Sequence, residues 1–184
     1  MIIQLNTPLT HQSIQSLKAG DMVEITGSVY TARDAAHQKL TELILAGEKL
    51  PFDLRDQIIY YVGPCPAPEG RVIGSAGPTT SGRMDKYAPK LIEMGLTGMI
   101  GKGQRNAAVV DAMKKYGAVY FGAVGGAGAL ISKCVVSLEL IAFSELGTEA
   151  VRKLSLVNFP AIVVIDQYGN NLYESGRKQY ALEP

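Results

Sequence analysis

Hydrophobic and polar positions follow two different periods in the first part of the chain. In the stretch 21–32, Val23 and Ile25 alternate with polar neighbours, which is the period-two pattern of a half-buried strand. From 33 to 47 the apolar residues instead recur at helical spacing, and Gly47 offers a stop. The pattern therefore predicts a strand that leads directly into a helix.

Further elements follow from the same two periods. We expect helices at 10–18, 81–94, 106–117 and 148–156, strands at 57–63, 71–77, 96–103, 118–126 and 134–143, and a hairpin at 161–174. Strand and helix alternate through the second half, which indicates βα units and a parallel sheet. Strands of the first third lack regular helices between them, which favours added antiparallel pairing. We predict an α/β fold with one domain over 1–184, in three layers.

Composition narrows the class of protein. A chain of 184 residues that is 47% hydrophobic and 19% charged suits a globular domain with a sizeable core. The net charge of +1, without a long run of either sign, argues against a nucleic-acid or polybasic membrane surface. The N-terminus lacks the basic start and apolar run of a signal peptide, so we expect a cytoplasmic protein without membrane contact.

The sequence offers no metal-binding motif. Cys65 lies in a proline-rich loop and Cys134 in an apolar run, and they form no Cys-x-x-Cys pair. With only His11 and His37, a histidine metal site is not expected. The turn around Lys102 lacks the glycine and hydroxyl residues of a phosphate-binding P-loop. We therefore expect no metal ligand in this chain.

The stretch "GPTTSGR", residues 77–83, concentrates groups that bind anions. Thr79 and its two hydroxyl neighbours precede Gly82 and Arg83, just where a helix is expected to begin. Free N–H groups at a helix start favour an anion, and arginine grips a carboxylate with two parallel hydrogen bonds. An ordinary Thr/Ser helix cap with a surface arginine remains the alternative reading.

Two further cations occupy comparable positions. Arg33 lies where the first long strand meets its helix, and Lys102 lies in the "GKG" turn after another strand. Ligands in open parallel sheets bind beyond the carboxyl ends of the strands. Arg33, Arg83 and Lys102 would then converge on one doubly charged anion, although each alone is also typical of a solvated surface. Arg105 lacks this context and is expected to tolerate lysine.

No residue of the chain is an obvious catalyst. The sequence shows neither a paired carboxylate in a recognisable setting nor an activated nucleophile, and a threonine hydroxyl is a poor base. If the protein takes part in catalysis, the reactive group comes from elsewhere.

Several motifs together resemble a known family. "GPTTSGRMDKY", with "TARDAAH" before it and "GKG" after it, resembles the β subunit or C-terminal domain of the iron–sulfur hydro-lyases, the class I fumarases and L(+)-tartrate dehydratases. The resemblance covers nearly the whole chain, including "SELGTEAVRKLSLVNFPAIVVIDQYGNNLY". It implies a swivelling β/β/α domain with a central parallel sheet and an antiparallel one.

The same resemblance implies a division of labour. A partner α subunit would hold a [4Fe–4S] cluster, and this chain would supply groups that bind a C4 dicarboxylate. At matching positions these groups are Arg33, Thr79, Arg83 and Lys102, and Thr79 is also placed near the reacting carbons as a proton carrier. His37 follows the arginine motif and either orients it or is a structural histidine.

Substrate and assembly remain open at this stage. Gly82 stands where the tartrate enzymes carry a bulkier residue, which favours fumarate hydration over tartrate dehydration. The chain begins with its own methionine, which suggests a separately encoded subunit that forms a homodimer when isolated. The alternatives are an L(+)-tartrate dehydratase β subunit and a stand-alone anion-binding module.

Overall fold

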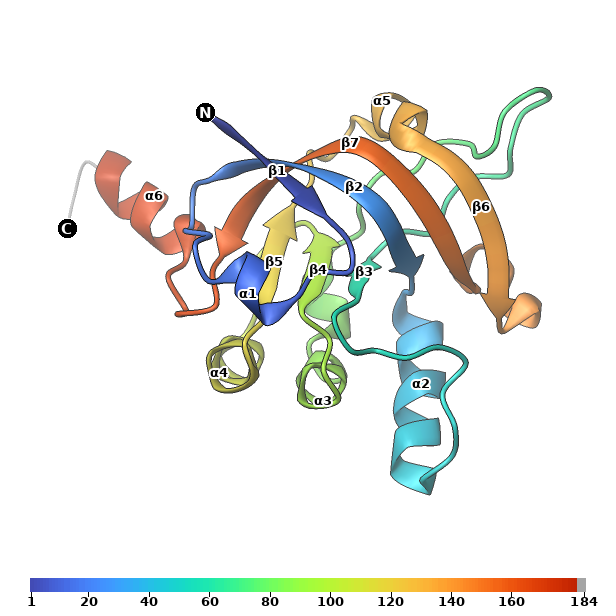
Figure 1. The fold of residues 1–184 in the computed structure, drawn as a ribbon, viewed down its shortest axis with the longest axis horizontal. Helices are drawn as coiled ribbons and strands as arrows, with labels where there is room; N and C mark the ends of the chain where they lie inside the picture. Colours follow the sequence, from blue (N-terminus) through green and yellow to red (C-terminus); the bar gives the residue numbers. More distant parts are fainter. Residues whose placement is uncertain (182–184) are drawn as a thin grey trace.

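Parallel and antiparallel strands share one mixed sheet in the computed structural model, which describes residues 1–181 (Figure 1). The strands are β1 (Ile2–Asn6), β2 (Met22–Thr31), β3 (Ile58–Tyr60), β4 (Gly98–Gly101), β5 (Val119–Gly122), β6 (Val135–Ala142) and β7 (Val151–Ile165). The helices are α1 (His11–Ile14), α2 (Asp34–Ala46), α3 (Ala88–Glu93), α4 (Ala107–Tyr116), α5 (Gly128–Ile131) and α6 (Leu172–Tyr180). Short 3₁₀ turns are η1 (Ser81–Met84), η2 (Ser132–Cys134) and η3 (Ser144–Glu149).

The middle of the sheet closes on itself. Strands β2, β3, β4 and β5 pair in parallel, in that order. The long strand β7 runs antiparallel to both β2 and β5, which completes a ring of hydrogen-bonded neighbours. β1 adds to β2 in parallel, and β6 adds to β7 in antiparallel fashion. The sheet therefore has a parallel side and an antiparallel side.

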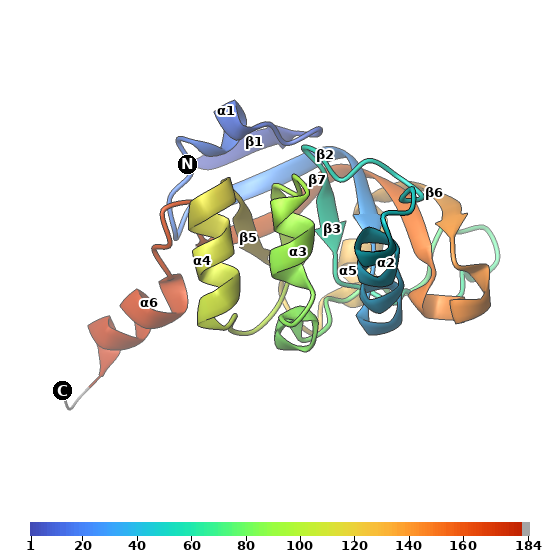
Figure 2. The ribbon, with the colours of Figure 1, turned by 90° about the horizontal axis from the view of Figure 1, so that it is seen from below.

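Two hydrophobic clusters hold these layers together. The first lies between the parallel and antiparallel strands and contains Tyr60, Phe121 and Phe159, each fully buried. The second packs the other face of the parallel strands, including Met99, against α2, α3 and α4, which lie side by side over that face (Figure 2). The fold class predicted from the sequence, a layered α/β arrangement, is confirmed.

The antiparallel pairing expected for the first third is present only where β2 pairs with β7. β1, β2 and β3 pair in parallel, and the antiparallel strands are β6 and β7 from the last third. A short helix, α1, separates β1 from β2, and α2 separates β2 from β3, so both connections have room for a parallel crossover. β1 itself was not among the expected elements.

The strand expected at 71–77 is a loop. Its backbone folds back on the proline-rich segment, since the Cys65 N–H donates to the Ser75 carbonyl at 2.9 Å and the Gly74 N–H to the Cys65 carbonyl at 3.2 Å. The backbone groups are thus paired within the loop rather than with the sheet.

Two expectations near the C-terminus also differ from the structure. The region 148–156 is mostly the start of β7, because this strand is paired on both sides by β2 and β6. In the expected hairpin at 161–174 the turn is present and is closed by one antiparallel bridge between Ile165 and Asn171, but α6 begins at Leu172 in place of a second strand. Asn171 caps that helix by accepting a hydrogen bond from the Tyr173 N–H at 3.1 Å.

Candidate functional site

The carboxyl ends of β2, β3 and β4 lie at one edge of the sheet, and the segment 79–83 crosses this edge. The Thr79 N–H donates to the carbonyl of Tyr61, just after β3, at 2.8 Å. The Ser81 N–H donates to the carbonyl of Lys102, just after β4, at 2.9 Å. Arg33 follows β2 at the same edge. The four predicted site residues therefore belong to neighbouring segments of one strand-end edge.

Arg33 is held between a carboxylate and a glycine. Its Nη2 lies 3.2 Å from Oε1 of Glu149, whose other oxygen accepts the Ala35 N–H at 3.1 Å. An ideal Cβ placed on Gly63 would lie only 2.8 Å from Nη1 of Arg33. Glycine at this position therefore leaves the space that the guanidinium group occupies.

Arg83 is half-exposed and is held by one oxygen. Its Nε donates to Oδ1 of Asp34 at 2.9 Å, and this is its one side-chain hydrogen bond among residues 1–181. The N–H groups of both terminal nitrogens therefore have no partner among residues 1–181 and lie at an exposed edge.

The expected helix 81–94 is interrupted, which corrects one part of the sequence argument. Ser81–Met84 is a single 3₁₀ turn, and α3 begins only at Ala88 with Pro89 in its first turn. Proline lacks an N–H and disfavours a helical residue before it, so the helix restarts there. A four-residue turn has no appreciable macrodipole, so the predicted anion site would have to rest on side chains.

Ser81 belongs to the framework of the site. Its buried hydroxyl lies 2.8 Å from the Tyr120 hydroxyl and accepts the Lys102 N–H at 3.1 Å. The Tyr120 hydroxyl in turn donates to the Gly103 carbonyl at 2.9 Å. These bonds fix the "GKG" turn, while the Lys102 side chain remains exposed and Thr79 is half-buried.

Tyr61 and Tyr120, the buried tyrosines behind this edge, are weaker acids than an exposed tyrosine. Burial raises the pKa of Tyr120 and that of Tyr61, so both stay protonated at neutral pH. Their hydroxyls act as neutral hydrogen-bonding groups.

Unsatisfied buried polar atoms gather at the start of α2. Within residues 1–181, the buried side-chain nitrogens and oxygens without a hydrogen-bond partner are Arg33 Nε, Asp34 Oδ2 and His37 Nε2. Such atoms are rare in folded proteins because each carries an uncompensated desolvation cost. Their concentration in "RDAAH" distinguishes this turn from an ordinary helix start and makes it part of the candidate site.

His37 is a neutral, fully buried histidine. Its Nδ1 lies 2.9 Å from the Arg33 carbonyl, which can only accept, so Nδ1 carries the proton. Its ring meets that of Tyr61 edge-on at 5.2 Å. Burial, opposed by the hydrogen bond to Arg33, lowers the pKa of His37 to about 4. The side chain therefore packs behind Arg33 and supports the backbone that carries it.

Arg105, for which the sequence predicts tolerance of lysine, lies in the core. Its side chain is fully buried, and its Nε donates to Oδ1 of Asp85 at 2.6 Å. The other Asp85 oxygen accepts the Asn106 N–H at 2.7 Å, and the guanidinium group stacks near the rings of Tyr61 and Tyr120. Asp85 of "GRMDKY" thus joins the motif to the core behind the site.

Sequence reasoning missed three residues of the site. Asp34, Glu149 and Gly63 surround the two arginines in space. Asp34 follows Arg33 directly, so its position beside that arginine was available as a signal. Glu149 is distant in sequence, and nothing local links it to Arg33.

Potential metal-binding side chains are scattered over the part of the chain that the structure describes. Over residues 1–181, no cluster of three or more His, Cys, Asp or Glu side chains is arranged for a metal ion. Cys65 is exposed in the proline-rich loop, as expected, whereas Cys134 is only half-buried. The side chains described here do not fit an iron–sulfur cluster. No helix in the described part is long and apolar enough to cross a membrane.

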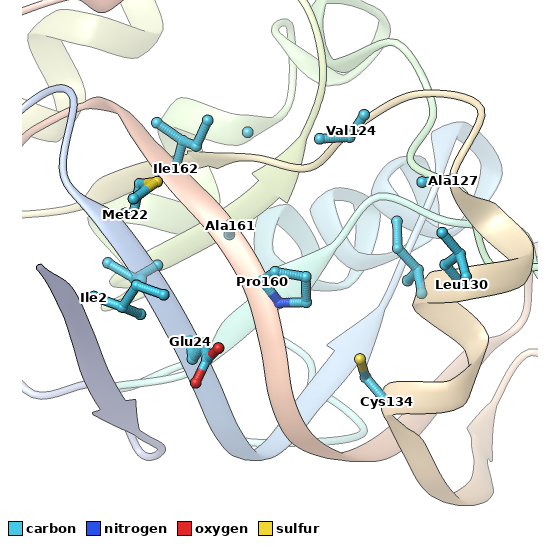
Figure 3. Close-up of a pocket in the computed structure, with 13 residues that line it drawn as sticks. Ile2, Met22, Glu24, Val124, Ala127, Leu130, Cys134, Pro160, Ala161 and Ile162 are labelled. Atoms are coloured by element: carbon cyan, nitrogen blue, oxygen red, sulfur yellow. The ribbon is translucent and has the colours of Figure 1, made fainter.

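An apolar groove of about 340 Å³, shown in Figure 3, is lined by none of the four predicted site residues. Ile2 and Met22 stand on one side, Val124 and Leu130 on the other, and residues 160–162 of β7 lie between them. The groove is lined by Ile2, Met22, Val23, Glu24, Gly122, Val124, Ala127, Leu130, Ile131, Cys134, Pro160, Ala161 and Ile162. The four exposed large side chains make this a water-accessible hydrophobic surface.

Comparison with known protein families gives one match. The sequence of residues 1–176 fits the family described as "Fumarase C-terminus". That match covers both arginine motifs and the "GKG" turn.

Individual relatives divide into long and short proteins. The chain is 38% identical to "Fumarate hydratase class I, aerobic" of Salmonella typhimurium, with 94% of this chain and 30% of that protein aligned. It is 39% identical to "Fumarate hydratase 2" of Leishmania major, with 93% and 31% aligned. It is 40% identical to a candidate "L(+)-tartrate dehydratase subunit beta" of Methanocaldococcus jannaschii, with 93% and 91% aligned. The chain therefore spans less than a third of each of these two fumarate hydratases, but nearly all of the archaeal protein.

Proposed function

The chain belongs to the Fumarase C-terminus family, and we propose that it is the β subunit of a hydro-lyase of the class I fumarate hydratase type. The observation that carries the proposal is the meeting of Arg33, Thr79, Arg83 and Lys102 at one strand-end edge. Three cations on one edge suit a substrate with two carboxylates. The reaction is the addition of water across the double bond of fumarate, which gives malate.

Each of these side chains has a specific part in the proposal. Arg83 presents its free terminal nitrogens to one substrate carboxylate, and Arg33 and Lys102 neutralise the rest of the charge. When hydroxide adds to one carbon, electron density moves from the double bond toward the carboxylate of the adjacent carbon. Donors fixed on that carboxylate bind the transition state more tightly than the substrate. The Thr79 hydroxyl gives its proton to that carbon and regains a proton from the water that became the hydroxide, so that one whole water is added.

The proposal includes a partner α subunit. The chain alone presents its binding groups on an open edge, with both Arg83 and Lys102 exposed. Its two cysteines and two histidines provide no cluster site in the described residues. An iron–sulfur cluster held by the α subunit would supply the Lewis acid that binds the hydroxyl group. This chain's residues would then close over that cluster from the opposite side.

We propose that the α subunit also covers the apolar groove. The segment from Gly122 to Leu130 contributes residues to one wall of the groove. An ideal Cβ on Gly125 would lie 3.7 Å from Nζ of Lys102. An α subunit that covers Lys102 at the strand-end edge would therefore also contact this segment and, through it, the groove.

A charged substitution in the groove tests this contact. Leu130 and Leu45 are 65% and 76% exposed, so Leu130→Glu and the control Leu45→Glu should both leave the fold intact. We expect Leu130→Glu to weaken α-subunit binding about 10-fold or more, measured by sedimentation, because a carboxylate is buried in an apolar contact. If Leu130→Glu instead abolishes only self-association of this chain, a second copy covers the groove.

Tartrate is the second candidate substrate. The supporting observation is the archaeal protein, of which this chain covers 91%. Gly82 argues the other way. An ideal Cβ there would meet only the Gln104 carbonyl oxygen at 3.7 Å, so packing does not require glycine. An open position at 82 leaves room at the edge where the substrate would bind.

Co-expression with an α subunit tests the proposed function. The purified complex is assayed with fumarate, malate, mesaconate and both tartrates. We expect hydration of fumarate to be fastest. Activity on L(+)-tartrate alone would favour the second candidate. Absence of any complex, together with direct anion binding by this chain, would favour a stand-alone anion-binding module.

A further inference from the structure

We propose that Asp34 is a positioning residue that sets the spacing and orientation of the two arginines of the site. The inference rests on the proposed function, because it concerns how the dicarboxylate is gripped. It gives the Asp34 carboxylate a role in a site whose proposed substrate contacts are made by Arg33, Thr79, Arg83 and Lys102.

Asp34 contacts both guanidinium groups. Its Oδ1 accepts the Arg83 Nε–H at 2.9 Å, and its Oδ2 lies 3.7 Å from Nη2 of Arg33. Arg83 comes from the segment that crosses the strand ends, whereas Asp34 begins α2. One carboxylate therefore links two segments that are far apart in sequence.

The contact with Arg83 determines which face of that arginine is free. A guanidinium group binds a carboxylate either through Nε and one terminal nitrogen or through both terminal nitrogens. Asp34 occupies Nε of Arg83, so only the end formed by the two terminal nitrogens remains for a substrate. An arginine held in this way loses less freedom on binding than one that is free.

The backbone around Asp34 is itself fixed, so the carboxylate is a suitable reference point. The neighbouring Ala35 N–H donates to Glu149 at 3.1 Å, and the His37 side chain is bonded to the Arg33 carbonyl at 2.9 Å. Glu149 also holds the Arg33 guanidinium at 3.2 Å. Each arginine thus has its own carboxylate, and Asp34 alone contacts both.

A competing role for Asp34 predicts the opposite result. If its carboxylate merely occupied the anion site, removal of its charge would free Arg83 and strengthen the binding of any anion. If it positions the arginines, removal of its charge weakens dicarboxylate binding even though the site becomes more positive. The buried Oδ2, which has no hydrogen-bond partner, shows that Asp34 is not simply a solvated counterion.

The experiment compares Asp34→Asn with Asp111→Asn in the complex of both subunits. Asp111 is exposed on α4, has no side-chain hydrogen bond or ion pair among residues 1–181, and gives a matched control. We expect Asp34→Asn to lower kcat/KM for fumarate about 10-fold and Asp111→Asn to change it less than about 2-fold. Equal or improved fumarate turnover in Asp34→Asn would overturn the inference.

A double-mutant cycle separates positioning from a general structural effect. In an Arg83→Ala background, Asp34→Asn should cost less than about 2-fold, because the hydrogen bond to Arg83 is gone and only the longer 3.7 Å contact with Arg33 remains. A full 10-fold loss in that background would show that Asp34 does not act through Arg83.

A second readout is independent of activity. In proton–nitrogen NMR spectra of this chain, Asp34→Asn should shift the Nε–H signal of Arg83, and Asp111→Asn should not. If the wild-type complex is inactive on every acid tested, the proposed function fails while this measurement still tests the link. An unshifted Arg83 signal in Asp34→Asn would refute the link itself.

Discussion

Arg83 and Arg105 make the same contact in opposite surroundings. Each donates its Nε to one aspartate oxygen, Arg83 to Asp34 at 2.9 Å and Arg105 to Asp85 at 2.6 Å. The Arg83 side chain is 50% exposed, whereas that of Arg105 is fully buried. The terminal nitrogens of Arg105 face Met99 and Tyr61, while those of Arg83 have no side-chain partner among the residues described.

The comparison shows that an ion pair alone does not identify a binding arginine. What distinguishes Arg83 is the part of its guanidinium group that the protein leaves unused at an exposed edge. Arg105 uses its whole guanidinium group to hold the core together. Substitutions at the two positions should therefore change different properties of the protein.

The largest effect is expected from Arg105→Met. Removal of the guanidinium group leaves the Asp85 carboxylate buried without its charged partner, which typically costs about 3–5 kcal/mol. The free energy of unfolding, measured by urea denaturation, should fall by that amount.

Arg55→Met is the matched control, because Arg55 forms an exposed ion pair with Asp53. It should change the free energy of unfolding by less than about 1 kcal/mol. A loss of similar size in both variants would remove the distinction between the buried and the exposed arginine.

His37 is bonded to the Arg33 carbonyl and packs against Tyr61, which in turn contacts Arg105. Because His37 is buried, we expect the stability of the fold to fall in acid. Its pKa is lowered from 6.5 to about 4 in the folded protein, so the unfolded chain binds the proton more readily. The contribution of neutral His37 to the free energy of unfolding is fully present above pH 6.5. It is lost as the pH falls from 6.5 to about 4. The loss amounts to about 3 kcal/mol.

Urea denaturation between pH 7 and pH 4 measures this dependence. His37→Gln should flatten the dependence over that interval, whereas a change of the exposed His11 to Gln should leave it as in the wild type. A wild-type protein with constant stability between pH 6.5 and pH 4 would show that His37 titrates normally.

The sequence predicted those elements whose own pattern decides their structure. Strand β2 and helix α2 each carry a clear period, and both formed near the expected bounds. The region after Thr148 misled the prediction because Val151 and Leu154 have helical spacing while Leu154 and Leu156 alternate. Pairing with β2 and β6 decides between these readings, and that information lies far away in the chain.

The candidate site shows the same limit. Arg33, Thr79, Arg83 and Lys102 were predicted from strand ends and motif resemblance, and the structure brings their segments together. Their carboxylate partners were not predicted, because the contact of Arg33 with Glu149 depends on tertiary folding. The burial of Arg105 was missed for a similar reason, since an arginine in a polar stretch is usually exposed.

The central claim is that Arg83 binds a substrate carboxylate through its two free terminal nitrogens. The most direct test is kcat/KM for fumarate in complexes that carry Arg83→Lys, with Arg55→Lys as an exposed control at the opposite ends of the strands. Lysine keeps the charge but loses the two parallel hydrogen bonds, so we expect Arg83→Lys to lower kcat/KM by about 100-fold, or about 3 kcal/mol, without a change in stability. An Arg83→Lys complex as active as the Arg55→Lys complex would contradict the claim and leave "GPTTSGRMDKY" as a purely structural turn.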